Sequence, residues 1–444
     1  MRSLGIAIWP EDCMSWGNGR RGVGDRLSGK GGAAVDAEEA SAIGARARMI
    51  RRRRGLSLDV VAGLAGISKP YLSQLEHGQR GFNRRGLLED LAIALGCSVV
   101  DLTGQPYLPP DRASADALAT LPAVSIAIHE CSLSDVPDVP TRPVEQLAAL
   151  VAAANRHVDE TRYQLAGQDL GSALTELHVH AVSGTPDVRR AALVALTEAC
   201  IVAAGIARPL GNGELSTLAA KRATEAAALT DRCELVSLAG MTRVGALVRL
   251  GARHRARTVL AGELAAAEPH ADPSAADTSP AQGYGMLHLV GAQLAARDNR
   301  AAEADTHLAE ARQLAKATGE RNAYHYHFGP ANVAAWSLAI AVELDRGPTA
   351  VETLDASSAT LAALGSADRR AGVHLDLSRA YAQSGGDRDA EALQHIDTAD
   401  RIAPTRIRND PIARDLVVAL DRRARRRVWE LDSLRHRFGV GAGR

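Results

Sequence analysis

An amino-terminal stretch with helical periodicity and regular breaks constrains the fold of this chain most strongly. Between residues 43 and 95, apolar residues recur at steps of three and four, which predicts a series of short amphipathic α-helices. Gly55 and Gly66 fall where the first and second helices should end, because glycine readily adopts the conformation that closes a helix. Ser57 lies where the second helix should begin, since a serine hydroxyl can cap a free backbone N–H, and the third helix should begin at Ser68. A fourth helix is predicted over 87–95.

The third predicted helix has two different faces. Leu72 and Leu75 are spaced to face inward, and Pro70 is tolerated because the first turn of a helix does not need its missing N–H. A short helix supported in this way by the preceding one has the geometry of a helix-turn-helix, whose second helix enters the major groove of DNA. The outward side chains are those of Lys69, Pro70, Ser73 and Gln74.

Four motifs in this stretch carry a family resemblance. An arginine-rich first helix is followed by Gly55-Leu-Ser57, by Val61-Ala-Gly-Leu-Ala-Gly-Ile-Ser68 and by Leu75-Glu-His-Gly78. Residues 43–104 thereby resemble the Xre/Cro/lambda-repressor helix-turn-helix family. The resemblance implies base contacts from the four outward residues above and an ion pair between Arg51 and Glu76. It also implies phosphate contacts at or near Ser57, Ser68, His77 and Arg80.

Two features depart from the family pattern. The family usually has a glutamine that touches the DNA backbone near the start of the second helix, whereas this chain has Leu58. A missing phosphate anchor predicts modest affinity or dependence on dimerisation. The loop 79–85 is longer than the family's, and it places Arg84 and Arg85 as further candidates beside Arg80.

The distribution of charge supports contact with phosphate. Residues 41–104 contain ten Arg and Lys against five Asp and Glu, although the whole chain balances at 52 against 52. An arginine run alone is typical of a solvated helix face. Beside the motifs, it favours a DNA-facing role.

The flanking segments are predicted to lie outside the packed domains. Residues 1–40 are rich in Gly and charge with little apolar periodicity, which predicts a disordered arm. Residues 105–143 carry proline-bearing segments at both ends and are interpreted as a linker, with a short helix or strand near 118–129. The helix-turn-helix domain is accordingly assigned to residues 41–104.

The cellular compartment of the protein is predicted from the absence of targeting signals in the sequence. The chain has no run of eighteen apolar residues and no compact leader-like start, so we expect a cytoplasmic protein that does not engage a membrane. The five cysteines contain no Cys-x-x-Cys pair, which supports neither a disulfide framework nor a zinc site. We expect no cofactor.

From residue 144 to 440 the sequence predicts an α-solenoid, so the whole chain is predicted to be all-α. Ala- and Leu-rich helical periodicity is interrupted by short polar turns about 39 to 48 residues apart, the length of one helical hairpin with its connections. Six hairpins are the simplest count. The clearest, 287–315 and 375–403, resemble long and degenerate tetratricopeptide repeats. The turns fall near 167–169, 211–213, 251–254, 298–300, 346–348 and 385–387.

An unusual cluster of aromatic and histidine residues interrupts this pattern. The rings could line a ligand site, with the histidines as polar contacts, or they could fill a gap where the repeat is longest; packing is the commoner role of such clusters. We expect no metal at the two histidines, because no third ligand of suitable spacing lies nearby in the sequence. The cluster comprises Tyr324, His325, Tyr326, His327, Phe328 and Trp336.

The carboxyl terminus is basic again. Residues 401–444 hold twelve Arg against five acidic residues, including the run 421–427. This segment could add phosphate contacts, pair with an acidic surface, or simply form a solvated face.

Together these features predict a sequence-specific DNA-binding transcriptional regulator. Its partners would be a double-stranded DNA operator, a small-molecule or peptide effector, and a second copy in a homodimer. The alternative is a protein-protein adaptor that uses the repeats, with a non-specific or vestigial helix-turn-helix. No nucleophile motif, phosphate-cradling loop or metal-ligand set supports an enzyme.

Overall fold

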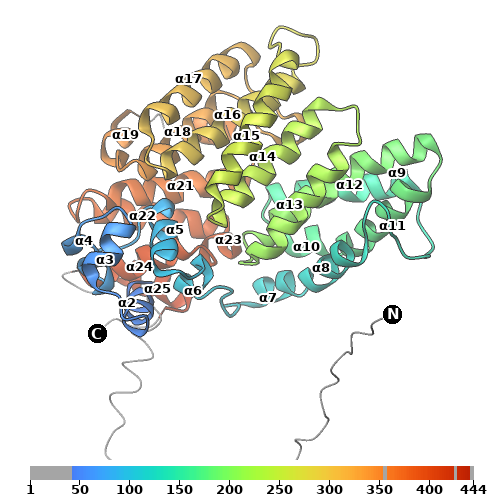
Figure 1. Ribbon diagram of the computed structural model, residues 1–444. Helices are drawn as coiled ribbons and strands as arrows, with labels where there is room; N and C mark the ends of the chain where they lie inside the picture. The colour runs from blue at the N-terminus through green and yellow to red at the C-terminus, as the bar shows by residue number, and fades with distance from the viewer. Residues whose placement is uncertain (1–42, 354–357, 425–427, 441–444) are drawn as a thin grey trace, which may run out of the picture.

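The computed structural model describes residues 43–353, 358–424 and 428–440, and every regular element in these ranges is helical (Figure 1). The predicted all-α class is therefore confirmed. The predicted disordered arm at 1–40 and the arginines at 425–427 lie outside the described residues.

Five helices form the amino-terminal domain. They are α2 (Ile43–Arg53), α3 (Leu58–Leu64), α4 (Lys69–Glu76), α5 (Arg85–Leu95) and α6 (Val99–Thr103). Their apolar faces meet in one core, which contains the inward residues Leu72 and Leu75 of α4 together with Leu91 of α5. Ile412, from the far end of the chain, completes this core.

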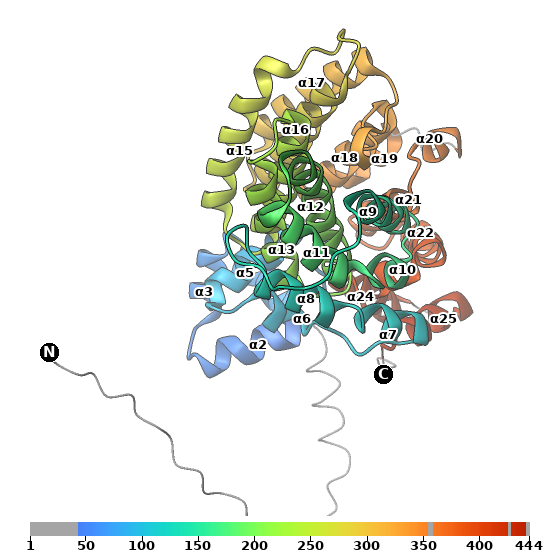
Figure 2. The same ribbon diagram turned by 90° about the vertical axis from the view of Figure 1, so that its right-hand side faces the viewer.

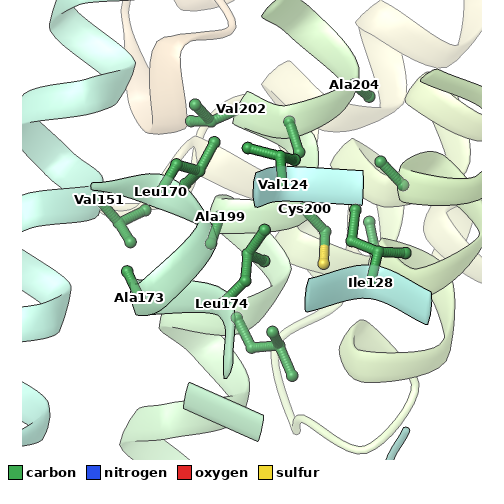
Figure 3. Packing of buried hydrophobic residues seen from close by; sticks show 14 of the residues in the cluster. Val124, Ile128, Val151, Leu170, Ala173, Leu174, Ala199, Cys200, Val202 and Ala204 are labelled. Atoms are coloured by element: carbon green, nitrogen blue, oxygen red, sulfur yellow. The ribbon is translucent and has the colours of Figure 1, made fainter. Parts of the chain in front are cut away.

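The segment 105–143, which was expected to be a linker with a short helix or strand near 118–129, contains two helices, α7 (Arg112–Leu118) and α8 (Leu121–Glu130). Val124 and Ile128 of α8 are fully buried and pack with Leu174 and Cys200 (Figure 3). The prolines around α8 are typical of a connection, but the apolar face of the helix joins it to the core of the next domain.

The remaining helices pack as sequential pairs. Neighbouring helices contact each other along most of their length, as α12 does with α13, α16 with α17 and α21 with α22. The helices are α9 (Val144–Asp159), α10 (Tyr163–Gly167), α11 (Leu170–Ser183), α12 (Pro186–Ala207), α13 (Gly213–Ala227), α14 (Cys233–Arg249), α15 (Arg253–Ala267), α16 (Ser279–Arg297), α17 (Ala301–Thr318), α18 (Pro330–Glu343), α19 (Gly347–Thr353), α20 (Ser358–Ala363), α21 (Ala367–Ala382), α22 (Asp389–Ile402), α23 (Pro404–Arg408), α24 (Pro411–Arg423) and α25 (Trp429–Phe438), with short 3₁₀ turns at Glu268–His270 and Ala323–His325.

All six turns expected from the sequence separate helices in the structure. The two hairpins predicted most clearly are α16–α17 and α21–α22. Their buried alanines, such as Ala292 with Ala304 and Ala371 with Ala399, allow close helix pairing.

The helix pairs are arranged so that helices from early and late parts of the sequence contact each other. Helix α21 contacts α9, and these two helices lie side by side in Figure 2. Helices α5 and α16 are also in contact, which places the amino-terminal domain against the middle of the repeats. Both contacts depend on how the intervening helix pairs are arranged.

Helix α12 is the one described helix with the length and hydropathy of a membrane span. Two thirds of its apolar window is buried inside the protein, where Ala199, Cys200 and Val202 belong to the core shown in Figure 3. A core helix satisfies the same criteria, so this feature is weak support for a membrane span.

Candidate nucleic-acid interface

The serines and glycines of the amino-terminal domain act as helix boundaries. The backbone N–H of Val60 donates to Ser57 Oγ at 3.2 Å, and that of Tyr71 donates to Ser68 Oγ at 3.3 Å, so both serines are N-caps, as the sequence predicted for Ser57. Gly55 and Gly66 have φ values of +66°, which most side chains disfavour. These boundaries fix the turn between α3 and α4.

Helices α2 and α4 are held together by close packing and a buried ion pair. A Cβ atom on Gly44 would lie 2.0 Å from the carbonyl oxygen of Leu75, so only glycine permits this approach. Arg51 donates from Nε and Nη2 to the two carboxylate oxygens of Glu76, at 2.6 and 2.7 Å. This hydrogen bonding raises the pKa of Arg51. The family ion pair implied by the resemblance is therefore present.

The predicted base-contacting residues lie together on α4. Lys69 and Pro70 are exposed, and Ser73 and Gln74 are half-buried. Lys69 pairs with Asp59 at 2.8 Å, but both side chains are more than half exposed, so the lysine can exchange this partner at little cost. Figure 1 shows α3 and α4 at the outer edge of the molecule.

The candidate phosphate contacts surround this face. His77 and Arg80 are exposed; His77 Nδ1 lies 2.7 Å from the carbonyl of Ser73, and the Arg80 guanidinium lies 5.5 Å from the ring centre of Tyr71. Arg84 is half-buried immediately before α5. Leu58 packs against the apolar core, so the position that holds a polar anchor in the family makes an apolar contact here.

A basic cleft of about 410 Å³ opens beside the end of α4. It lies between α2, the turn after α4 and helix α24. Arg422 of α24 donates to the carbonyl of Gly78 at 3.2 Å, so one arginine of the basic carboxyl-terminal segment contacts the helix-turn-helix domain. The cleft includes Arg48, Arg52, Arg53, Arg80 and Arg422.

The long loop after α4 contacts the repeats. The N–H of Phe82 donates to Asp415 at 2.6 Å, and the carbonyl of Asn83 accepts two bonds from Arg379 at 2.6 and 2.9 Å. Phe82 is fully buried. Burial raises the pKa of Asp415 to about 6. The extra loop length thus forms a docking contact.

The amino terminus of α5 is capped by a residue of the repeats. The residue before α5 makes no side-chain cap, but the N–H groups of Arg85 and Gly86 donate to the carboxylate of Glu343, at 3.2 Å each. Arg85 also pairs with Asp410 at 2.6 Å, so it is unavailable to DNA in this arrangement. Burial alone would raise the pKa of Glu343, but the guanidinium groups of Arg379, Arg297 and Arg85 lower it to about 2.

A second buried carboxylate, Glu89 of α5, completes the contact. It pairs with Arg253 at 2.8 Å and with Arg297, and the side chains of Glu89 and Arg297 are only 4% and 3% exposed. Gly86 permits this approach, since a Cβ atom there would lie 3.0 Å from the carbonyl oxygen of Arg297. The amino-terminal domain is therefore docked on the repeats through desolvated charges.

The aromatic cluster between α17 and α18 divides into buried and accessible members. Tyr326 and Phe328 are buried in the core, whereas Tyr324 and Trp336 are half-buried. The two histidines meet Asp159, which lies 166 and 168 residues earlier in the chain. The sequence near the histidines offered no third ligand of suitable spacing, but in the structure Asp159 is a third potential ligand. Sequence spacing gave no signal of this contact because Asp159 lies far away in the chain.

Comparison with known proteins bears on both parts of the chain. Residues 42–103 match the family model described as a helix-turn-helix domain. No curated protein matches the sequence. Among solved structures, the apo form of the competence regulator ComR from Streptococcus vestibularis is similar over 65% of this chain and 95% of that one, at 14% identity and a TM-score of 0.22. The amino-terminal part of this protein is a helix-turn-helix domain, and a larger domain of paired helices follows it.

Proposed function

We propose that this protein is a sequence-specific DNA-binding transcriptional regulator whose helical repeats control the position of the reader. The observation that carries the proposal is the outer face of α4: the domain is docked on the repeats through its loop and α5, while Lys69 and Pro70 remain exposed. A recognition helix needs such a free face to enter a major groove.

Phosphate contacts would come from both domains. The capped amino termini of α3 and α4 offer partial positive charge, and the basic cleft adds guanidinium groups on either side. Because Leu58 replaces a polar anchor, one reader would bind weakly, which favours a homodimer. Two readers would then meet half-sites about 34 Å apart or a multiple of that distance, on a roughly palindromic operator.

The repeats would supply the control. Since a buried ion pair fixes α5 to α16 and backbone hydrogen bonds to Glu343 fix it to α18, a rearrangement of the hairpins would also move α4 and change the distance between two readers. A small-molecule or peptide effector would act by binding one arrangement better than the other. At the aromatic cluster, such an effector would contact the accessible Tyr324, His325 and Trp336, because Tyr326 and Phe328 are buried.

Binding of the full-length chain to selected DNA tests the proposal. Sequences are first enriched from random DNA, and affinity is then measured by fluorescence anisotropy at several salt concentrations. The double substitution Lys69→Ala and Gln74→Ala should remove about 1–3 kcal/mol for each base contact, and so reduce binding to the level of random DNA. A matched control is Gln313→Ala with Lys316→Ala, which removes the same side-chain types from the exposed face of α17.

Two further outcomes separate base from phosphate contacts. Arg422→Ala should weaken binding to selected and random DNA alike and lower the salt dependence by about one phosphate contact. Equal affinity of the Lys69/Gln74 double variant and the unmodified protein for the selected site would refute the proposal. If no sequence is enriched by the unmodified protein, the adaptor function becomes the better explanation, with the repeats as the binding surface.

A further inference from the structure

One group of side chains outside the DNA-reading domain gathers metal-binding chemistry. Asp159 ends α9, while His325 and His327 belong to the segment between α17 and α18. Asp159 Oδ2 lies 2.5 Å from His325 Nδ1, and Asp159 Oδ1 lies 2.9 Å from His327 Nε2. Each of the three residues offers a ligand atom within 4.8 Å of the other two.

The backbone around the histidines is held in an uncommon conformation. Tyr324, His325 and His327 have φ values of +47°, +59° and +48°, a region that residues other than glycine seldom occupy. Such conformations persist only when the surroundings enforce them, and they cluster at binding sites. The alternating residues Tyr326 and Phe328 are buried, so the aromatic side chains anchor the segment and direct the imidazoles to Asp159.

Further contacts fix both sides of the cluster. The N–H of His327 donates to Asn322 Oδ1 at 3.0 Å, which stabilises the turn that presents the histidines. The Ser366 hydroxyl donates to the carbonyl oxygen of Asp159 at 3.1 Å, and Tyr326 donates through its hydroxyl to the carbonyl of Glu234. Three contacts, made by Asn322, Ser366 and Glu234, thus hold the two segments that carry the ligand residues.

We propose that Asp159, His325 and His327 bind one divalent transition-metal ion, with zinc as the preferred member of this class. Two imidazoles and a carboxylate suit zinc and its first-row neighbours, whereas magnesium and calcium favour sets made of oxygen alone. The ion is held by His325 Nδ1, His327 Nε2 and the carboxylate of Asp159, and each imidazole binds it in the neutral form whose single proton is on the other ring nitrogen.

The exposure of the cluster indicates an open coordination position. The side chains of His325 and Asp159 are 29% and 21% exposed, while that of His327 is nearly buried. Structural zinc sites are closed by four protein ligands, but three protein ligands with solvent access leave room for water or a ligand group. This site therefore fits a sensor or ligand-binding centre better than a closed structural one.

The position of the site gives the ion a structural effect. Helix α9 belongs to the early part of the repeats and touches α21 of the late part (Figure 2). An ion shared by Asp159 and the two histidines therefore ties α9 to the segment before α18. Its binding therefore strengthens the contact between the early and late parts of the repeats.

Cobalt titration of the full-length protein tests the site. After treatment with a chelator, the protein is titrated with Co²⁺ and followed by visible absorption, because cobalt reports its ligands where zinc is silent. We expect one ion per chain and an upward shift of the thermal midpoint with zinc. Asp159→Asn and His327→Gln should each weaken binding at least tenfold. The control is His374→Gln, which removes a histidine 3.0 Å from His395 in another close pair.

Replacing one metal ligand by another type of ligand distinguishes loss of metal binding from loss of the fold. In His327→Cys, a bound cobalt ion should show an additional near-ultraviolet band from thiolate-to-metal charge transfer, which appears only when residue 327 is a ligand. Absence of cobalt and zinc binding by the unmodified protein overturns the proposal. So does unchanged binding by Asp159→Asn, or a His327→Cys variant that binds cobalt without the new band.

Discussion

The two sides of the helix-turn-helix domain use charged residues in opposite ways. On the outer side, Lys69 pairs with Asp59 in water, and both side chains stay more than half exposed. On the inner side, Glu89 pairs with Arg253 and Arg297 where almost no water reaches. Exposed pairs contribute little and are easily exchanged, whereas a buried charge that loses its partner is strongly destabilising. One side is therefore suited to a new partner and the other to a permanent contact.

The loop after α4 shows the same division within a few residues. Arg80 is exposed above Tyr71, whereas Arg85 pairs with Asp410 and donates its N–H to Glu343. In the sequence these arginines look equivalent. Their roles differ because the repeats cover one end of the loop and leave the other end open.

Removal of the inner carboxylate should give the largest effect. Glu89→Ala leaves Arg253 and Arg297 buried without this partner, which should cost about 3–5 kcal/mol of unfolding free energy. Asp59→Ala, the same change on the outer side, should cost less than about 1 kcal/mol. Urea unfolding measures both values, and equal losses for the two variants would contradict the contrast between the sides.

The second-largest effect should be a loss of stability of the inner contact at low pH. Because the folded pKa of Glu343 is lowered to about 2, its contribution is complete above its ordinary pKa of 4.5 and is lost as the pH falls through 2. A shift of this size corresponds to roughly 3–4 kcal/mol. The difference in unfolding free energy between the unmodified protein and Glu343→Gln should therefore shrink from pH 5 toward pH 2, and a constant difference would argue against this ion pairing.

Two glycine substitutions should change stability by smaller amounts, one at a packed position within the domain and the other at its open surface. Gly44→Ala forces a Cβ atom against the carbonyl of Leu75, which should cost about 1–3 kcal/mol. Gly63→Ala in α3 meets open space and should stabilise the helix by about 0.5–1 kcal/mol. Thermal unfolding distinguishes the two, and stabilisation by both substitutions would show that α2 and α4 pack less closely than described.

Local sequence patterns predicted much of the fold because they reflect local energetics. The capping serines Ser57 and Ser68, the Arg51–Glu76 pair and the six turns between repeats follow from nearby residues or from the family resemblance. The sequence did not reveal the packing of α8, because proline-bearing flanks are typical of linkers. It also gave no sign that Asp159 meets the histidines, since that contact depends on the curvature of all the repeats between them.

The cap on α5 has a consequence for the modularity of the protein. Because Glu343 caps that helix and Ile412 fills part of the amino-terminal core, a fragment ending near residue 104 would lose a helix cap and a core side chain together. Transplanting this domain onto another effector domain should therefore require replacements for both residues. The two domains follow one another along the chain as separate modules would. The stability of the amino-terminal domain nevertheless depends on residues of the repeats.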